Sequence, residues 1–569
     1  MNHPIPAIVA QGAVRRLPRA ALLLLCVAYV LPGFIGRNPW KSADITALGY
    51  MLELLRDGAN WMTPRLLGLA PEVEAQLPYW LGAWAIKIAP SFFPADLAAR
   101  FPFAILLALT LAATWYGTYL LARSPRAQPV AFAFGGEAQP ADYARAMADG
   151  ALLALLACLG LAQLSHETTP AVAQLCFTAL AFYAGASLSQ ARGAPVLVSF
   201  LAMLGLALSG APTVAVLLGL GGLLALLLDP SGADEPVRVP SAIVWRLGVA
   251  VLLVAVIATL LDLWRWRVEL PTSSLAEWRN LSRLLLWFTW PAWPLALWTL
   301  WRWRHQIVGA QASRHLLLPL WYVLVAVGCT LTTGSADRSL LLALPALAAL
   351  AAFALPTLQR SVSAAIDWFT LLFFSGCGII VWVIWIALQT GVPSQPAANV
   401  ARLAPGFEHS FSPLPFALAV LATLAWAWLV RWRVGRHPAA IWKSLVLPAG
   451  GAVWCLVLAM TLWLPLLDYA RSYAPLVRLI AQSVQTPECV EVLGLTRGQI
   501  AALQFHSQLA LRTASADAGC PVLLANGEAI ASKEHTVDAT QWTLHRTIKR
   551  PTDRSENIAI YRRTTRAAP

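Results

Sequence analysis

Charged side chains are scarce in this chain of 569 residues. They make up 12% of it, whereas a soluble globular protein has about 25%. Hydrophobic residues make up 58% of the chain, and the mean hydropathy is +0.63. This composition excludes an ordinary soluble enzyme. It also argues against nucleic acid as a partner, because no soluble basic domain of any size is present to neutralise phosphates.

The chain contains many long apolar runs. Runs of 18 or more apolar residues are long enough to cross about 30 Å of hydrocarbon, and they recur too often for a single signal peptide. We predict about 13 membrane-spanning helices and therefore an α-helical polytopic membrane protein. The predicted segments are 17–35, 97–122, 145–165, 169–190, 195–209, 212–228, 242–262, 284–302, 315–333, 338–356, 364–390, 413–431 and 443–466.

Basic residues predict the orientation of the chain. Arg15, Arg16 and Arg19 precede the first segment and place the N-terminus in the cytoplasm. An odd number of segments then places the polar tail outside. Cations also lie on the predicted outer side, where they suit a phosphate-binding site or interfacial snorkelling beside the 26 Trp residues. They include Arg37, Lys41, Arg65, Arg265, Arg267 and Arg338.

We divide the chain into a transmembrane domain, 1–466, with a large outer loop at 36–96, and a soluble C-terminal domain, 467–569. The C-terminal domain is predicted to be a small α/β domain. Its expected elements are a helix at 495–512 and strands at 521–524, 542–548 and 557–561. Six of the eight cysteines lie in apolar runs. Cys489 and Cys520 lie in the polar tail and can form a disulfide if the tail is extracytoplasmic.

The outer loop carries the candidate chemistry. An amphipathic helix is expected at 44–56, with Ser42 and Asp44 able to cap it and with Ile45 and Leu48 on an apolar face. We expect this helix and a second one at about 78–89 to lie along the outer membrane interface. Asp44 has two interpretations: a helix cap, or a carboxylate that orients or deprotonates an acceptor.

Two motifs follow Asp44 in this loop: WMTPRLLG at 61–68 and YWLGA at 79–83. A later segment, SADRSLLLALPALAALAAF at 335–353, places Arg338 before a Pro-containing span. With these motifs the chain resembles the bacterial relatives of protein O-mannosyltransferases. That group includes the lipid A aminoarabinose transferases and belongs to the GT-C glycosyltransferases, in glycosyltransferase family 39. The resemblance implies a GT-C fold in a bacterial inner membrane, with a periplasmic tail.

The chain also departs from the family pattern. Asp44 matches one carboxylate of the family's usual Asp-Glu pair, and the other is missing. In the second motif Val73 stands at the family's Glu, so Glu72 or Glu74 supplies a second carboxylate only after a shift of one residue. His166 and Glu167 match the family's second-loop acid loosely. They are candidates for substrate binding, a metal or a proton relay, or they are simply solvated loop residues.

The resemblance implies transfer of a sugar from a polyprenyl-phosphate donor, with inversion at the anomeric carbon. Asp44 is the expected base. Lys41, Arg65 and Arg338, with Arg265 and Arg267 behind them, are the expected phosphate ligands. The acceptor is a lipid A, another glycolipid, a glycan or a protein. Some relatives use a divalent metal ion, and the displaced second carboxylate leaves that requirement open here.

Two other functions fit the same residues. The first is a flippase or transporter of lipid-linked sugars, which would need paired or broken helices near the membrane midplane; no internal repeat supports it. The second is a degenerate family member that binds a lipid-linked sugar without transferring it, for which the missing carboxylate is the argument.

Overall fold

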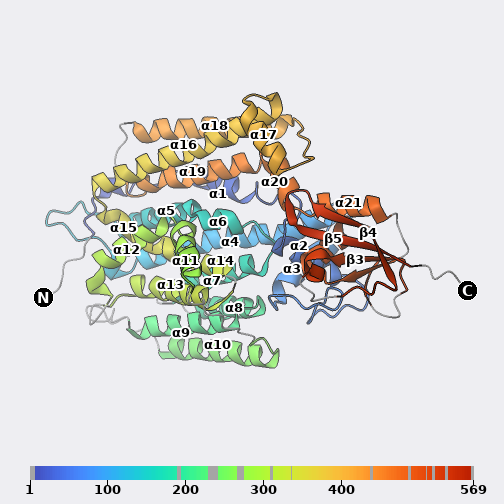
Figure 1. Cartoon of the computed structure of the whole chain (residues 1–569). Helices are drawn as coiled ribbons and strands as arrows, with labels where there is room; N and C mark the ends of the chain where they lie inside the picture. The colour runs from blue at the N-terminus through green and yellow to red at the C-terminus, as the bar shows by residue number, and fades with distance from the viewer. Residues whose placement is uncertain are drawn as a thin grey trace, which may run out of the picture. The chain divides into compact units, whose positions relative to one another are not determined.

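The computed structural model describes residues 7–188, 194–228, 241–264, 274–307, 312–334, 336–435, 440–484, 489–507, 509–514, 519–531 and 536–564. The chain forms two compact units (Figure 1). The first, which we call the helical unit, comprises Met1–Phe34, Pro102–Ile379 and Phe416–Met460. The second, the loop–tail unit, comprises Ile35–Phe101, Ile380–Pro415 and Thr461–Pro569. The domain boundary at 466/467 stays a prediction.

Apolar helices build the helical unit; three of them, α4, α16 and α18, begin or end in the other unit. The helices are α1 (Arg19–Val30), α4 (Ala95–Ala122), α5 (Pro140–Ala157), α6 (Leu159–Leu164), α7 (Pro170–Ser187), α8 (Ala194–Leu208), α9 (Pro212–Leu228), α10 (Ser241–Leu260), α11 (Leu275–Phe288), α12 (Ala292–Arg302), α13 (Arg314–Thr332), α14 (Ala336–Leu341), α15 (Leu344–Ala354), α16 (Arg360–Thr390), α18 (Pro413–Val434) and α19 (Lys443–Ala459).

Helix α15 forms the centre of this unit. All of its residues, Leu344–Ala354, are buried, and it packs against α5, α12 and α13. Its sequence is rich in alanine, and small side chains let helices approach closely in a membrane. Gly150 of α5 shows how close the approach is, because a Cβ there would lie 2.5 Å from the Leu355 side chain. Close packing of small residues therefore holds this core together.

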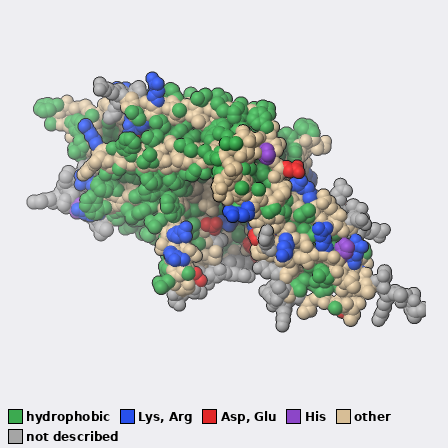
Figure 2. All heavy atoms as spheres, turned by 45° about the horizontal axis from the view of Figure 1, so that its top comes forward, with side chains coloured by type: hydrophobic (Ala, Val, Ile, Leu, Met, Phe, Trp, Pro, Cys, Tyr) green, Lys and Arg blue, Asp and Glu red, His purple; other side chains and the backbone are tan. Residues whose placement is uncertain are grey.

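The structure confirms a polytopic α-helical membrane protein. Among the described residues, six helices are long and apolar enough to span a membrane, or seven if α19 and α20 (Leu464–Arg471), bent by 71°, form one broken span. Helices α16 and α18 are largely exposed, with Leu372, Leu421 and Trp428 on the surface. Figure 2 shows one face on which hydrophobic side chains cover most of the helical part. Such a surface suits lipid and not water.

Several predicted spans are interrupted. The segment 145–165 is divided at Cys158 into α5 and α6, and the segment 338–356 is divided into α14 and α15. The segment 284–302 is divided into α11 and α12 around Pro291, which cannot donate a backbone hydrogen bond. The predicted number of thirteen spans stays a prediction.

The loop–tail unit combines the helices of the first loop with a mixed sheet. Its helices are α2 (Ala43–Glu53), α3 (Leu77–Ile88), α17 (Ser394–Leu403), α20, α21 (Ala474–Val484), α22 (Arg497–His506) and α23 (Gly527–Ala531). The strands are β1 (Val490–Leu493), β2 (Leu511–Thr513), β3 (Val522–Asn526), β4 (Trp542–Arg550) and β5 (Asp553–Arg563). The sheet order is β2-β1-β3-β5-β4, in which β1 is parallel to β2 and β3, and β5 is antiparallel to β3 and β4.

The predicted α/β tail is confirmed, with two differences. Helix α22 begins with the capping box of Thr496 and Gln499 but ends at His506, not at 512. Ser507 has an extended backbone there, and β2 begins at Leu511. Strand β1 was not predicted, since its four residues are too few to give an alternating pattern.

Candidate functional site

Asp44 lies in a buried ion pair with Arg37. The Arg37 guanidinium donates to Asp44 Oδ2 at 2.8 Å, and each side chain is 2% exposed. The backbone N–H of Trp40 donates to the same oxygen at 3.1 Å. A charge removed from water is tolerated when it is paired and hydrogen-bonded, and both conditions hold here. The carboxylate expected from the sequence therefore has a defined position at the first turn of α2.

This geometry corrects the expectation that Ser42 and Asp44 cap α2. Ser42 is the N-cap residue, but its side chain makes no capping hydrogen bond. Asp44 accepts from Trp40, which precedes the helix. Residues Ile45 and Leu48, expected on an apolar face along the membrane, are 0% and 2% exposed and lie in a helix that packs on α3 and α22. Helix α2 is thus built into the loop–tail unit.

A second carboxylate, Asp468 of α20, fixes the segment before α2. Its oxygens accept from the backbone N–H of Asn38 at 3.0 Å, from the Asn38 amide at 3.2 Å and from Trp40 Nε1 at 2.7 Å. The Arg37 guanidinium lies over the Trp40 ring, 4.8 Å from its centroid. Asp468 therefore holds the loop that carries both members of the ion pair.

Lys41 contacts the hairpin between β4 and β5. Its Nζ lies 3.2 Å from Asp553 Oδ2 and 3.0 Å from Glu556 Oε1. Hydrogen bonds from the Ser555 hydroxyl and from Lys41 lower the pKa of Asp553 to about 2. The Lys41 side chain remains about a third exposed. A cation expected to bind phosphate is thus already paired with two carboxylates of the tail.

The other first-loop candidates lie on the surface of the loop–tail unit. Glu72 is exposed and lies 3.5 Å from the Arg497 guanidinium. Glu74 is also exposed, two residues farther along. Arg65 is exposed and donates to the Gly68 carbonyl at 3.2 Å. The catalytic role of the two glutamates and the phosphate-binding role of Arg65 stay predictions.

The helical unit holds a second charged pair. Arg338 of α14 donates to Glu167 Oε2 at 3.1 Å, and the two side chains are 28% and 20% exposed. Asp337 Oδ1 lies 3.8 Å from the same guanidinium. Glu167 precedes α7, so the loop between α6 and α7 brings it to Arg338. The pair remains partly accessible to solvent or to a ligand.

His166 is buried, whereas its neighbour Glu167 is partly exposed. The Nε2 of His166 lies 2.9 Å from the Tyr29 carbonyl oxygen, and its Nδ1 lies 3.3 Å from the Ser165 hydroxyl. A Cβ at Gly33 would lie 2.1 Å from the imidazole ring, so glycine makes room for it. The interpretation of His166 as a solvated loop residue is therefore wrong. The ring packs within the helical unit.

The structure does not place two of the predicted phosphate ligands or a metal ion. Arg265 and Arg267 lie outside the described residues. Within the described ranges, no group of three or more His, Cys, Asp or Glu side chains is arranged to hold a metal ion. The metal requirement therefore stays open.

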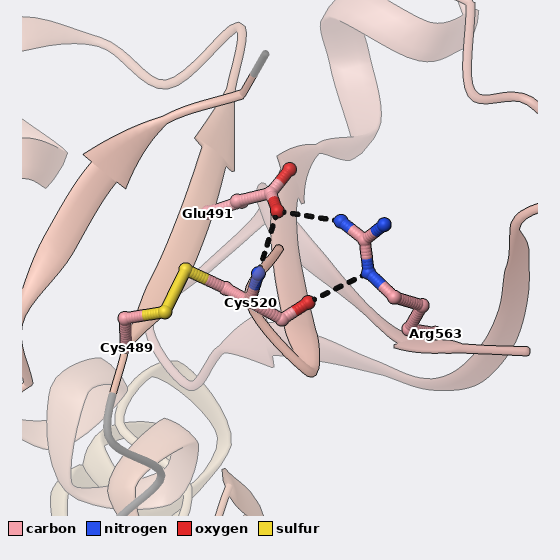
Figure 3. The surroundings of a disulfide bond; sticks show 4 residues. All are labelled: Cys489, Glu491, Cys520 and Arg563. Atoms are coloured by element: carbon pink, nitrogen blue, oxygen red, sulfur yellow. Dashed lines mark hydrogen bonds and ion pairs between the residues drawn. A yellow bond between two sulfur atoms is a disulfide. The ribbon is translucent and has the colours of Figure 1, made fainter. Parts of the chain in front are cut away.

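A disulfide cross-links the tail, as predicted from the two cysteines in its polar sequence. Cys489 and Cys520 form a disulfide beside Glu491 (Figure 3). Glu491 accepts from the backbone N–H of Cys520 at 3.1 Å and from Arg563 at 2.7 Å. The disulfide and this ion pair connect β1, the segment before β3, and β5.

The sequence pointed to Asp44 but not to the residues that hold it. Arg37 was only one of many outer cations, and nothing distinguished it from the others. Asp468 follows Asn38 by 430 residues, and its sequence context is an ordinary apolar helix end. Only the fold brings these groups together.

The fold, a set of membrane helices with an α/β tail, is shared with solved structures. The sequence matches no protein-family model and no curated protein. Its structure is similar to ArnT from Cupriavidus metallidurans bound to undecaprenyl phosphate, with a TM-score of 0.60, 14% identity, and coverage of 97% of this chain and 99% of that chain. It is similar to ArnT from the same organism in the apo state, with a TM-score of 0.59, 14% identity, and coverage of 95% and 97%.

Proposed function

We propose that this protein transfers a sugar from a polyprenyl phosphate to an acceptor outside the cytoplasm. The observation that carries the proposal is the buried Arg37–Asp44 pair at the start of α2, in a chain with the fold of ArnT. That ArnT was solved with undecaprenyl phosphate bound. An isoprenoid donor also accounts for a chain that is mostly membrane-embedded helix, since its tail requires an apolar environment.

Asp44 is the proposed base. Its carboxylate orients the acceptor hydroxyl or amine and takes its proton. The acceptor heteroatom forms a bond to the anomeric carbon while the bond from that carbon to the phosphate oxygen breaks. Attack opposite the leaving phosphate inverts the anomeric centre. Arg37 offsets the charge of Asp44 and holds it in place, which makes Arg37 a positioning residue.

Cations stabilise the departing lipid phosphate. Charge-assisted hydrogen bonds to an oxyanion are strongest in sites shielded from water. Arg338 of the helical unit and Lys41 of the loop–tail unit are each a candidate donor, and both are partly exposed. Each already pairs with a carboxylate, so phosphate binding requires the cation to exchange or share that partner. Arg65, Arg265 and Arg267 remain secondary candidates.

The proposed location is the bacterial inner membrane, with the N-terminus in the cytoplasm and the tail in the periplasm. The Cys489–Cys520 disulfide supports an extracytoplasmic tail, because disulfides persist in oxidising compartments. The sugar stays unassigned, and the acceptor remains a lipid A, another glycolipid, a glycan or a protein.

The direct test is transfer by the purified protein in lipid nanodiscs. The nanodiscs are supplied with a labelled polyprenyl-phosphate sugar and an extract of cell-envelope acceptors. We expect a labelled product and free polyprenyl phosphate with the wild type, and at least a 100-fold lower rate with Asp44→Asn. Asp57→Asn, a change of an exposed carboxylate in the same loop, is the matched control and should keep full activity. Movement of the donor across the bilayer without any product would support a flippase instead.

A further inference from the structure

The tail buries an arginine, Arg550, at the end of β4. Its side chain is 2% exposed, and it is among the largest fully buried side chains of the described chain. A guanidinium in such a position requires charged and hydrogen-bonded partners, because an unpaired buried charge is strongly unfavourable. Apolar residues can often replace a buried ion pair without loss of stability. The burial of Arg550 therefore points to a role other than stabilising the tail.

The partners of Arg550 lie in two places. Its Nη1 donates to Glu556 Oε2 at 2.8 Å, within the hairpin of β4 and β5. Its Nη2 donates outside this hairpin, to the backbone carbonyl oxygens of Ala470 at 2.6 Å and Ser472 at 3.3 Å. The guanidinium also lies over the Tyr473 ring, 5.1 Å from its centroid. Arg550 therefore fixes the backbone at the end of α20 and in the linker to α21.

The same backbone holds the segment that precedes α2. Trp40 and Ser472 form an antiparallel β-bridge. The backbone N–H of Lys41 donates to the Arg471 carbonyl oxygen at 2.8 Å. The backbone N–H of Trp40 in turn donates to Asp44 Oδ2 at 3.1 Å. A continuous path of backbone contacts therefore joins the buried arginine of the tail to the carboxylate of the proposed base.

We propose that Arg550 is a positioning residue for Asp44, an inference that rests on the proposed glycosyl transfer. A carboxylate acts as a general base only within hydrogen-bond reach of the proton that it removes. A displacement of about 1 Å can slow an enzyme by about 100-fold. Arg550 holds the peptide whose N–H group orients this carboxylate. The tail thus takes part in the reaction through a backbone contact, without a group that touches the substrate.

A second arginine of the same hairpin provides a matched comparison. Arg563 pairs with Glu491, donates to the Cys520 carbonyl oxygen and lies over the Trp542 ring. Its partners are therefore of the same three kinds as those of Arg550: a carboxylate, a backbone carbonyl and an aromatic ring. They belong to the tail sheet and to the segment before β3, and not to the linker before α21. Replacement of Arg563 controls for the loss of an arginine from the tail.

The test compares Arg550→Lys with Arg563→Lys in the full-length protein in nanodiscs. Lysine keeps the positive charge but lacks the planar fork of the guanidinium, so the carbonyl contacts are lost while the charge stays. Hydrogen–deuterium exchange of a peptide covering residues 37–46 measures the order of the segment without any reaction. With Arg550→Lys we expect exchange of this peptide to be at least about tenfold faster, through local opening. Arg563→Lys should leave it unchanged, and equal exchange in both variants would overturn the inference.

Thr552→Val makes a milder change in the same contact. It removes the hydroxyl that donates to the Ala470 carbonyl oxygen at 3.2 Å and leaves Arg550 in place. Exchange of the peptide covering residues 37–46 should rise by about twofold, while exchange of the β1 peptide stays unchanged. This variant decides the matter if Arg550→Lys does not fold. Unchanged exchange of the 37–46 peptide would then contradict the proposal.

Kinetics of the labelled sugar transfer distinguish positioning from a merely structural role. With Arg550→Lys, kcat should fall at least about tenfold and the KM for the donor should change less than about twofold, because Asp44 acts in the chemical step. In an Asp44→Asn background the same change should have no further effect on kcat, because the base is already absent. A further tenfold loss there would overturn the positioning role.

The two measurements fail separately. Absence of any product with the wild-type protein would contradict the proposed glycosyl transfer. The exchange comparison between Arg550→Lys and Arg563→Lys needs no reaction, so it would still decide whether Arg550 fixes the segment that orients Asp44.

Discussion

The two units each hold an arginine–carboxylate pair, and the pairs differ in burial. Arg37 and Asp44 in the loop–tail unit are 2.8 Å apart and 2% exposed, whereas Arg338 and Glu167 in the helical unit are 3.1 Å apart and 28% and 20% exposed. Removing one partner of a buried pair leaves an uncompensated charge, which costs about 3–5 kcal/mol. Exposed pairs contribute about 0–1 kcal/mol. The first pair is suited to hold a fixed geometry, and the second to exchange its partner for a ligand.

The largest expected effect follows from breaking the buried pair. Asp44→Ala leaves Arg37 buried without its carboxylate and should lower the free energy of unfolding by about 3–5 kcal/mol. Denaturant unfolding of the purified protein measures the change. Asp57→Ala is the control and should change stability by less than about 0.5 kcal/mol. A similar small change for Asp44→Ala would show that the pair does not hold the loop.

A variant of Asp468 tests whether the buried Arg37–Asp44 pair depends on the hydrogen bonds that hold the segment before α2. Asp468→Ala removes the acceptor of three hydrogen bonds from Asn38 and Trp40, and the donors left unpaired should cost about 2 kcal/mol. Because Asp468 holds the segment that carries Arg37, its effect should not add to that of Asp44→Ala. Additive effects in the double variant would mean that the two carboxylates act independently.

Asp44 and Asp468 show what could be predicted from the sequence and what could not. Long apolar runs predicted the membrane helices because hydrophobicity alone determines a span. Three strands of the polar tail were predicted from short apolar segments bounded by turn residues. Asp44 was predicted because it follows a span, starts a helix and fits the family resemblance. Its burial was not predicted, since it depends on Asp468 and α22, which lie more than 400 residues away in the sequence.

The partly exposed pair should affect donor binding more than stability. Arg338→Gln should change the free energy of unfolding by about 1 kcal/mol or less, yet raise the KM for the labelled donor at least tenfold if Arg338 binds the phosphate. Glu167→Gln separates the two roles, because it breaks the same ion pair but leaves the cation. Equal increases in KM for both variants would mean that the ion pair matters and not phosphate binding.

The smallest expected effect is on the pH dependence of Tm when a carboxylate that pairs with Lys41 is replaced. The pKa of Asp553 is lowered to about 2, first by the Ser555 hydroxyl and then by Lys41. A pKa below its unfolded value of about 3.9 stabilises the folded protein at neutral pH, and this stabilisation is lost as the pH falls from about 4 to about 2. Asp553→Asn should therefore lower Tm at pH 7 and have little effect at pH 2. A difference in Tm that is equal at both pH values would contradict this assignment.

The most direct test of the central claim separates the structural role of Asp44 from its chemical one. The double variant Arg37→Gln/Asp44→Asn replaces the buried ion pair with two neutral polar side chains, which should recover much of the stability lost in the single variant. Transfer of the labelled sugar by this double variant is the measurement. The account predicts a folded protein with at least 100-fold slower transfer than the wild type. Transfer at the wild-type rate would contradict it, because Asp44 would then be a structural residue only.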